Sequence, residues 1–489
     1  MIDFIRKHPL PVAGVILFIC MAVGLSFYGA RSTDILNRSE YSAFYKDIKA
    51  KAEDGYFTDQ SVLSGYITSW ADEKGLEYTI DDSGNIIFTD EAVERKKNVS
   101  PTVICASYNY ETVEDNTRLL TSAAMIAGTD TNAGRKTVVF VNDEQNTGSG
   151  YRHLSKKLFK NKAKVIYMDY GSSAYMSNSS FAKKKSSISV KAGRYEPSCD
   201  SAVRIHISGL DSGIIGTGIT KHPDPVSALS TLLTRLKSKS AIYQLADFEI
   251  GTNGDMYPVS MDATIMLNSY AVPSFTKYLD KRIKAWDKAY GGDYEELSYT
   301  YELIEDPEQM PQEAYSRKAT EKLTNVLYTI QSGLYKYEAG DSIPEGRAEG
   351  DVYGINAVTG IRAADGAIVI DIMTQAYDDE YMQKIMDDNA AAAELFDCTF
   401  TDGESVPRFL NEKDSLYRTF RTTFYKVNRT ISANTVLTTD SDNYFTPCSY
   451  LAAKNENADI IHLRLNSDQA RMITNTILCY VAYKGNMLF

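Results

Sequence analysis

Histidine is scarce in this sequence, and the few histidines lie outside the common metal-binding patterns. The chain of 489 residues contains five, and none belongs to a His-Glu-x-x-His motif or to another recognisable ligand pattern. The six cysteines are widely spaced and form no Cys-x-x-Cys pair, which excludes a zinc ribbon and a thioredoxin-like redox motif. We expect most cysteines to be buried as small apolar residues, with one disulfide left open as an alternative.

Motifs for other kinds of chemistry are also absent. The sequence has no Gly-x-Ser-x-Gly nucleophile elbow and no Gly-x-x-x-x-Gly-Lys phosphate loop. No local pattern brings a cysteine and a histidine together, as a cysteine nucleophile requires. The net charge of −12 argues against nucleic acid as a partner, because nucleic acid is bound by basic patches.

An uncharged apolar run near the N-terminus is the clearest local feature. Residues 10–30 contain no charged side chain and follow Arg6 and Lys7. Roughly 20 apolar residues cross a bilayer as a helix, and a basic flank places the preceding end in the cytoplasm. We therefore predict a single-pass membrane protein with a cytoplasmic N-terminus and a large extracytoplasmic domain. A signal peptide cleaved near residues 24–26 is the alternative.

Helical and strand patterns alternate after the apolar run. Apolar residues at helical spacing predict two helices within residues 39–74, followed by a hairpin over 76–89. Buried strands are then expected at 102–107, 137–141 and 165–168, with a helix of small residues between the first two. This pattern predicts an α/β fold with a mostly parallel sheet flanked by helices, and a ligand site beyond the carboxyl ends of the strands.

Seven segments, in one order along the chain, carry a family resemblance. They are residues 75–88 (GLEYTIDDSGNIIF), 141–150 (VNDEQNTGSG), 165–173 (VIYMDYGSS), 207–219, 255–267, 351–361 and 466–480. The set resembles the two-zinc metallopeptidases of the M20 type, which include aminoacylases, carboxypeptidases and aminoacyl-histidine dipeptidases. The second segment is similar to that family's strand-end Asp-Glu-Glu, and the third is similar to its strand with a metal-binding aspartate.

The resemblance implies a zinc-peptidase-like α/β domain with an inserted α+β lid domain, preceded here by the transmembrane helix. We expect the cytoplasmic tip, anchor and linker in residues 1–38. The peptidase-like domain would take its first part from 39–187 and its second part from 400–489. Residues 188–399 would form the lid, through which two copies of the chain would associate as a homodimer.

The resemblance also implies which residues occupy the catalytic positions, and most of these positions are altered. The metal-ligand positions correspond to Tyr108, Tyr110, Asp115, Gln145, Asp169 and Leu465, the general base to Glu144, and the lid histidine to Ile214. We count Glu144 and Asp169 as the survivors, a relic general base and a relic metal ligand. A phenol with a pKa of about 10, a neutral amide and an aliphatic side chain are poor zinc ligands.

Each survivor also fits a structural role. The structural interpretation is the favoured one for both, with Asp169 as the cap of a turn after its strand and Glu144 as a hydrogen-bonded carboxylate at a strand end. His462, in the apolar sequence IIHLRL, is expected to be structural unless a different alignment makes it the last metal ligand.

Three hypotheses of different classes follow. The favoured one is a membrane-anchored extracytoplasmic pseudoenzyme that keeps the peptidase scaffold to bind a peptide or an envelope protein, with no cofactor. The second is a divergent metal-dependent dipeptidase or amidohydrolase that uses zinc in a rearranged site. The third is a purely structural envelope module whose cleft is filled. Two isolated carboxylates cannot hold a pair of zinc ions, which is why the first hypothesis is favoured over the second.

Overall fold

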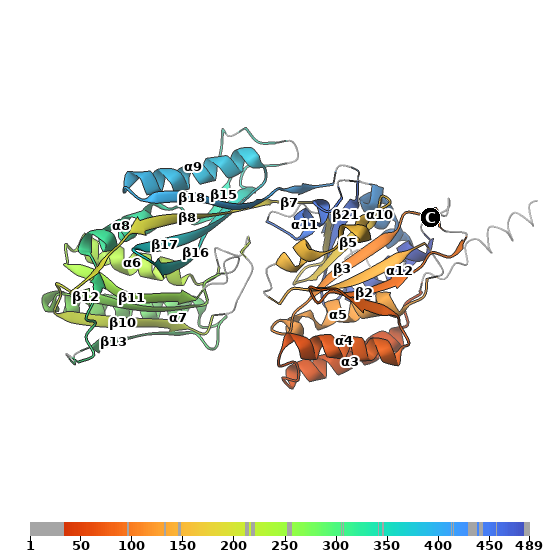
Figure 1. Ribbon diagram of the computed structural model, residues 1–489, viewed down its shortest axis with the longest axis horizontal. Helices are drawn as coiled ribbons and strands as arrows, with labels where there is room; N and C mark the ends of the chain where they lie inside the picture. Colours follow the sequence, from red (N-terminus) through yellow and green to blue (C-terminus); the bar gives the residue numbers. More distant parts are fainter. Residues whose placement is uncertain are drawn as a thin grey trace, which may run out of the picture.

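The computed structural model describes residues 34–483, with gaps at 95–96, 132–133, 145–147, 211–214, 217–220, 252–256, 305, 307, 341, 345–346, 412, 414, 429–437, 440–443 and 456. The described residues form two α/β units that lie side by side and are joined near β7 (Ser179–Ser180) (Figure 1). Within these ranges, no helix is long and apolar enough to cross a membrane. The expected anchor at residues 10–30 lies outside them.

The first unit is built on a mixed sheet to which both ends of the chain contribute. Its strands are β1 (Tyr78–Ile80), β2 (Ile86–Asp90), β3 (Thr102–Tyr108), β4 (Lys136–Asn142), β5 (Lys164–Tyr170), β6 (Tyr175–Ser177), β20 (Thr438–Thr439) and β21 (Asp459–Leu465). They pair in the order β1-β2-β4-β3-β5-β21-β6-β20. Because β4, β3, β5 and β21 run parallel, their carboxyl ends lie at one edge of the sheet.

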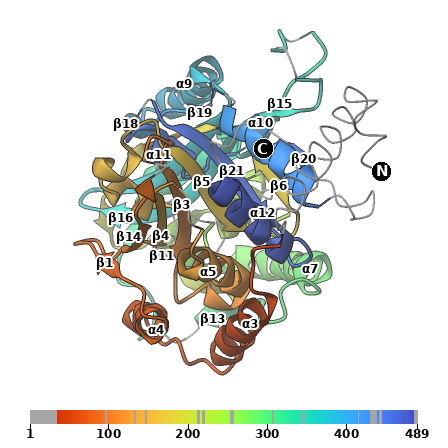
Figure 2. The ribbon, with the colours of Figure 1, turned by 90° about the vertical axis from the view of Figure 1, so that its right-hand side faces the viewer.

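Helices cover both faces of this sheet (Figure 2). One face packs against α3 (Arg38–Glu53), α4 (Gln60–Glu73), α5 (Val113–Gly128), α10 (Ser415–Val427) and α12 (Ala470–Tyr483). The other face packs against η2 (Ser149–His153), η3 (Lys156–Phe159) and α11 (Cys448–Ala452). Neighbouring strand residues divide between the two layers, as Ile104 and Cys105 do in β3. The predicted α/β fold with a helix-flanked sheet is therefore confirmed.

The second unit contains two antiparallel sheets. The first has the order β11-β12-β10-β13 and the second β15-β16-β17-β8-β18. Their strands are β8 (Ala182–Lys191), β10 (Ser201–Ser208), β11 (Tyr243–Gly251), β12 (Ser260–Leu267), β13 (Ser298–Ile304), β15 (Gly333–Lys336), β16 (Val352–Ala364), β17 (Ala367–Ala376) and β18 (Thr399–Val406). The helices of this unit are α6 (Pro225–Ser238), α7 (Val272–Tyr290), α8 (Arg317–Thr329) and α9 (Asp379–Leu395). Short additional elements of this unit are η5 (Ser269–Ala271) and β9 (Arg194–Tyr195) paired with β14 (Ala314–Tyr315). Strand β19 (Phe409–Leu410) pairs with β7 where the two units are joined.

Strands β8 and β18 lie where the chain enters and leaves the second unit. They pair with each other in an antiparallel register that begins with Thr399 opposite Ser189. The expected domain breaks after residues 187 and 399 fall inside these two strands.

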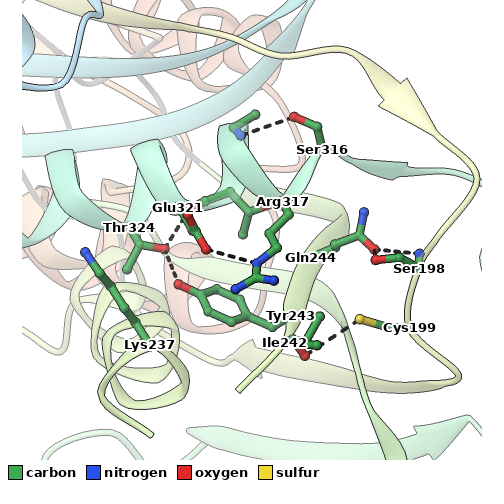
Figure 3. A network of polar contacts seen from close by, with 12 residues as sticks. Ser198, Cys199, Lys237, Ile242, Tyr243, Gln244, Ser316, Arg317, Glu321 and Thr324 are labelled. Atoms are coloured by element: carbon green, nitrogen blue, oxygen red, sulfur yellow. Dashed lines mark hydrogen bonds and ion pairs between the residues drawn. The ribbon is translucent and has the colours of Figure 1, made fainter. Parts of the chain in front are cut away.

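A polar network fixes α8 to the edge of the four-stranded sheet (Figure 3). The buried Gln244 amide accepts hydrogen bonds from the Ser198 backbone N–H at 2.7 Å and hydroxyl at 2.8 Å, and donates to the Tyr315 carbonyl at 3.0 Å. The Tyr243 hydroxyl lies 3.1 Å from the Thr324 hydroxyl of α8. These contacts satisfy buried polar groups that would otherwise destabilise the core of this unit.

Candidate functional site

Asp169, at the carboxyl end of β5, is bound by two side chains of β21. In the parallel register between these strands, Arg464 lies opposite Asp169. Arg464 Nη2 donates to Asp169 Oδ2 at 2.6 Å, and Arg464 Nε lies 3.0 and 3.1 Å from the two carboxylate oxygens. His462 Nε2 lies 2.8 Å from Asp169 Oδ1. The carboxylate therefore carries several charge-assisted hydrogen bonds, the strongest kind in proteins.

The surroundings of Asp169 hold it in the ionised form. Burial acts to raise the pKa of this carboxyl, but His462 and Arg464 outweigh that effect and lower the pKa to about 2. In return, the Asp169 carboxylate raises the pKa of Arg464 despite the burial of the guanidinium. The pair is thus charged throughout the physiological range of pH.

Tyrosine rings surround this ion pair. The His462 ring lies 4.8 Å from the Tyr167 ring and 5.3 Å from the Tyr175 ring, measured between centroids. The Arg464 guanidinium lies 5.1 Å from the Tyr175 ring and 5.4 Å from the Tyr444 ring, and the two tyrosine hydroxyls are 2.5 Å apart. Such cation–π contacts add to the stabilisation of a desolvated guanidinium.

Tyr108 and Leu465 lie on the opposite face of the sheet. Both belong to the core beneath α5 and α12, where Leu465 is fully buried and Tyr108 donates a 2.6 Å hydrogen bond to the Gly84 carbonyl. Successive strand residues point to opposite faces, so Leu465 cannot share a face with its neighbour Arg464. The structure does not bring these two expected ligand positions to Asp169.

Tyr110 and Asp115 lie beyond the end of β3. The Tyr110 backbone N–H donates to Gln60 Oε1 at 3.0 Å, and its hydroxyl donates to Glu111 Oε1 at 3.1 Å. Asp115 is exposed in the first turn of α5, where the helix dipole favours an acidic residue. Neither side chain is part of the Asp169 cluster.

Of the two acidic residues after β4, one is buried and the other is exposed to solvent. Glu144 is exposed, and its backbone carbonyl accepts a 3.0 Å hydrogen bond from Asn109 Nδ2. Asp143 is buried, and its carboxylate accepts hydrogen bonds from the Gly148 N–H at 2.8 Å and the Gly150 N–H at 3.4 Å. Asp143 therefore binds the backbone at the start of η2. Gln145 and Ile214, the remaining expected site residues, lie outside the described residues.

Arg464 is the residue of the Asp169 cluster that the sequence interpretation missed. The signal was present in β21, whose sequence DIIHLRL places His462 and Arg464 two residues apart in an otherwise apolar strand. Two polar residues at strand spacing share one face, and that face also carries Asp169. His462 was expected to be structural, and its fully buried ring binds Asp169.

The described residues do not fit the two-zinc centre that the resemblance implied. Among them, no group of three or more histidine, cysteine, aspartate or glutamate side chains could hold a metal ion. Metal binding at Asp169 would require displacement of Arg464, and Leu465 offers no donor atom. A zinc site needs several nitrogen, oxygen or sulfur donors around one point, which this arrangement does not supply.

Comparison with solved structures identifies the fold. An aminoacylhistidine dipeptidase from Vibrio alginolyticus aligns with a TM-score of 0.55 and 14% sequence identity, over 92% of this chain and 98% of that one. A tripeptidase from Staphylococcus aureus aligns over 92% and 98% of the chains, at a TM-score of 0.46 and 8% identity. A dinuclear metal-binding peptidase of the M20 family from Bacillus subtilis aligns over 90% and 98%, at a TM-score of 0.38 and 9% identity.

The dipeptidase alignment spans almost the whole of both chains, so this protein has the fold of that peptidase. The resemblance inferred from the seven sequence segments is confirmed at the level of the fold. The sequence matches no protein-family model and no curated protein.

Proposed function

We propose that this protein is a membrane-anchored extracytoplasmic pseudoenzyme that keeps a peptidase scaffold to bind a peptide or a protein partner. The observation that carries the proposal is the ion pair between Asp169 and Arg464, with a contact of 2.6 Å. At the position where the resemblance implies a metal ligand, the carboxylate is neutralised by a cation that belongs to the chain itself.

A guanidinium cannot replace a catalytic metal. A catalytic zinc ion keeps an open coordination position and lowers the pKa of the water bound there, whereas Arg464 offers only N–H donors. If a metal ion bound Asp169, Arg464 would lose its ion-pair partner and remain as an unpaired, partly buried charge. The penalty for such an unpaired buried charge is several kcal/mol, which disfavours exchange.

The remaining catalytic candidates do not form an alternative centre. Without a metal-bound water, Glu144 has no activated nucleophile to deprotonate. His462 and Asp169 form a histidine–carboxylate pair like that of a general base, but the His462 side chain is fully buried. A general base must come within hydrogen-bond distance of its substrate, so this pair favours a structural role over a divergent hydrolase.

The membrane anchor and the partner are part of the same proposal. The anchor rests on the uncharged run at residues 10–30 after Arg6 and Lys7. It would hold the peptidase-like units outside the cytoplasm, where a peptide or an envelope protein is accessible and the lid could join two copies of the chain. Protease added to intact cells should digest the large domain. Protection of that domain, together with cleavage of the N-terminus, would contradict this orientation and place the large domain in the cytoplasm.

The functional part is tested by hydrolysis assays on the full-length chain. With zinc or manganese present, a panel of dipeptides should remain uncleaved, and Glu144→Ala should not change the background rate. Glu53→Ala, at the end of α3 in the first unit, serves as the matched control for removal of a carboxylate. Metal-dependent hydrolysis that Glu144→Ala abolishes and Glu53→Ala leaves intact would promote the divergent hydrolase.

A further inference from the structure

The second unit contains a cavity of about 280 Å³ bounded by α6, α7 and β16. The lining residues that determine its chemistry are His222, Asp224, Tyr257, Arg282, Trp286 and Tyr290. The volume lies just below the roughly 300–1,000 Å³ that is typical of small-molecule sites. A ligand of this cavity is therefore small.

Aromatic rings form fixed walls of this cavity. His222 stacks on Tyr257 with 4.2 Å between ring centroids and 15° between planes. The Tyr257 hydroxyl accepts a hydrogen bond from the Gly216 N–H and donates one to the Gly216 carbonyl, both at 3.1 Å. Trp286 contacts Tyr290 edge-on, with centroids 5.5 Å apart. These walls suit an apolar or aromatic group of a ligand.

Arg282 supplies a positive charge on the cavity wall. Its side chain is partly buried on α7, and the described residues give it neither an ion pair nor a hydrogen bond. A partly desolvated guanidinium is stabilised by a planar anion, and a carboxylate matches its paired N–H groups. The cavity therefore presents a binding group for a carboxylate.

Asp224 supplies a negative charge on the same cavity. Its carboxylate caps α6, accepting hydrogen bonds from the Val226 N–H at 2.9 Å and the Ser227 hydroxyl at 2.5 Å. Burial raises the pKa of Asp224, so a cationic ligand group beside it would stabilise its ionised form. The described structure contains no ion pair between Asp224 and Arg282. Asp224 and Arg282 therefore do not neutralise each other, and a ligand in the cavity meets both charges.

We propose that this cavity binds a free α-amino acid with an apolar side chain. The ligand carboxylate pairs with Arg282, its ammonium group pairs with Asp224, and its side chain packs against the Tyr257 and Trp286 rings. A zwitterion satisfies both cavity charges at once, which a simple amine or a simple acid cannot do. The site belongs to the second unit and does not involve Asp169, so it stands independently of the pseudoenzyme proposal.

Ligand analogues test this inference on the purified full-length chain. Isothermal titration calorimetry should show one binding site per chain for L-phenylalanine or L-leucine. Phenethylamine lacks the carboxylate, and N-acetyl-phenylalanine lacks the ammonium group. Each should bind at least about tenfold more weakly than L-phenylalanine, which corresponds to about 1.4 kcal/mol. Equal binding of an analogue and the parent amino acid would overturn the zwitterion assignment, and so would the absence of binding by both amino acids.

Matched variants locate the binding site. Arg282→Gln and Asp224→Asn should each weaken L-phenylalanine binding at least about tenfold, and Asn caps a helix as well as Asp does. Lys284→Gln removes an exposed charge from the same helix and should leave the affinity unchanged. Circular dichroism checks that every variant is folded. Undiminished binding by folded Arg282→Gln, or an equal loss in Lys284→Gln, would overturn the proposal.

Discussion

Arg464 Nη2 lies 2.6 Å from Asp169 Oδ2, and the two residues face each other across adjacent parallel strands. The contact joins positions 295 residues apart in the sequence, one on β5 and the other on β21, which lies beside β5 in the sheet. It neutralises the carboxylate that the M20 resemblance marks as a metal ligand. The same contact links the C-terminal segment to the body of the first unit.

Loss of Arg464 should destabilise the protein. Arg464→Met leaves Asp169 in a largely buried site with His462 as its remaining partner there, and removal of one member of a buried pair is strongly unfavourable. We expect the free energy of unfolding to fall by about 3 kcal/mol, measured by urea denaturation. Arg471→Met, at an exposed position in α12, should change it by less than about 0.5 kcal/mol. Equal effects of the two substitutions would show that the pair contributes little.

The same carboxylate predicts an acid-sensitive part of the stability. The folded state lowers the pKa of Asp169 from its ordinary value of 3.8 to about 2. A lowered pKa stabilises the fold above pH 4, and this contribution disappears as the pH falls from about 4 to about 2. The contribution is about 2 kcal/mol. Unfolding measured at several pH values should show a shallower loss in Asp169→Asn, whereas exposed Asp115→Asn should follow the wild type.

Leu465 should behave as a core residue and not as a vacated ligand position. Leu465→His places a polar ring in the apolar layer beneath α12, so we expect a loss of about 3 kcal/mol and no gain in zinc affinity. Leu395→His, at a side chain that is 68% exposed, is the control and should be nearly neutral. Zinc binding gained by Leu465→His would mean that this position faces the Asp169 cluster.

The Gln244 network should be important for the second unit. Gln244→Leu leaves the Ser198 N–H and the Tyr315 carbonyl without their side-chain partner, at an expected cost of about 2 kcal/mol. Gln383→Leu removes an exposed amide from α9 and should cost much less. Hydrogen exchange should locate the loss of protection in α8 and β11 if the network acts as described. Loss confined to the first unit would contradict this assignment.

Strands of the first sheet could be predicted because their apolar runs are continuous. Expected strands at 102–107, 137–141 and 165–168 correspond to β3, β4 and β5, each with ends within a few residues. A strand buried on both faces has little amphipathic alternation, so its run of apolar residues is the dominant signal.

The pairing at Asp169 could not be predicted from the sequence. It depends on which strand lies beside β5 and on the register that places Arg464 opposite Asp169. A shift of one residue would instead present Leu463 or Leu465, and local sequence does not specify that shift. The side of the sheet on which Tyr108 and Leu465 lie could not be predicted either, because an alignment to family segments does not say which face of a strand a residue occupies.

Zinc content of the full-length protein tests the central claim most directly. The protein should be purified from cells grown with added zinc, without chelators, and analysed by mass spectrometry for metal after extensive dialysis. The guanidinium of Arg464 forms an ion pair with the carboxylate of Asp169, so this carboxylate is not free to bind a metal ion. We therefore predict no stoichiometric zinc in the wild type and none in Asp169→Ala. Stoichiometric zinc that survives dialysis in the wild type and is lost in Asp169→Ala would contradict the account.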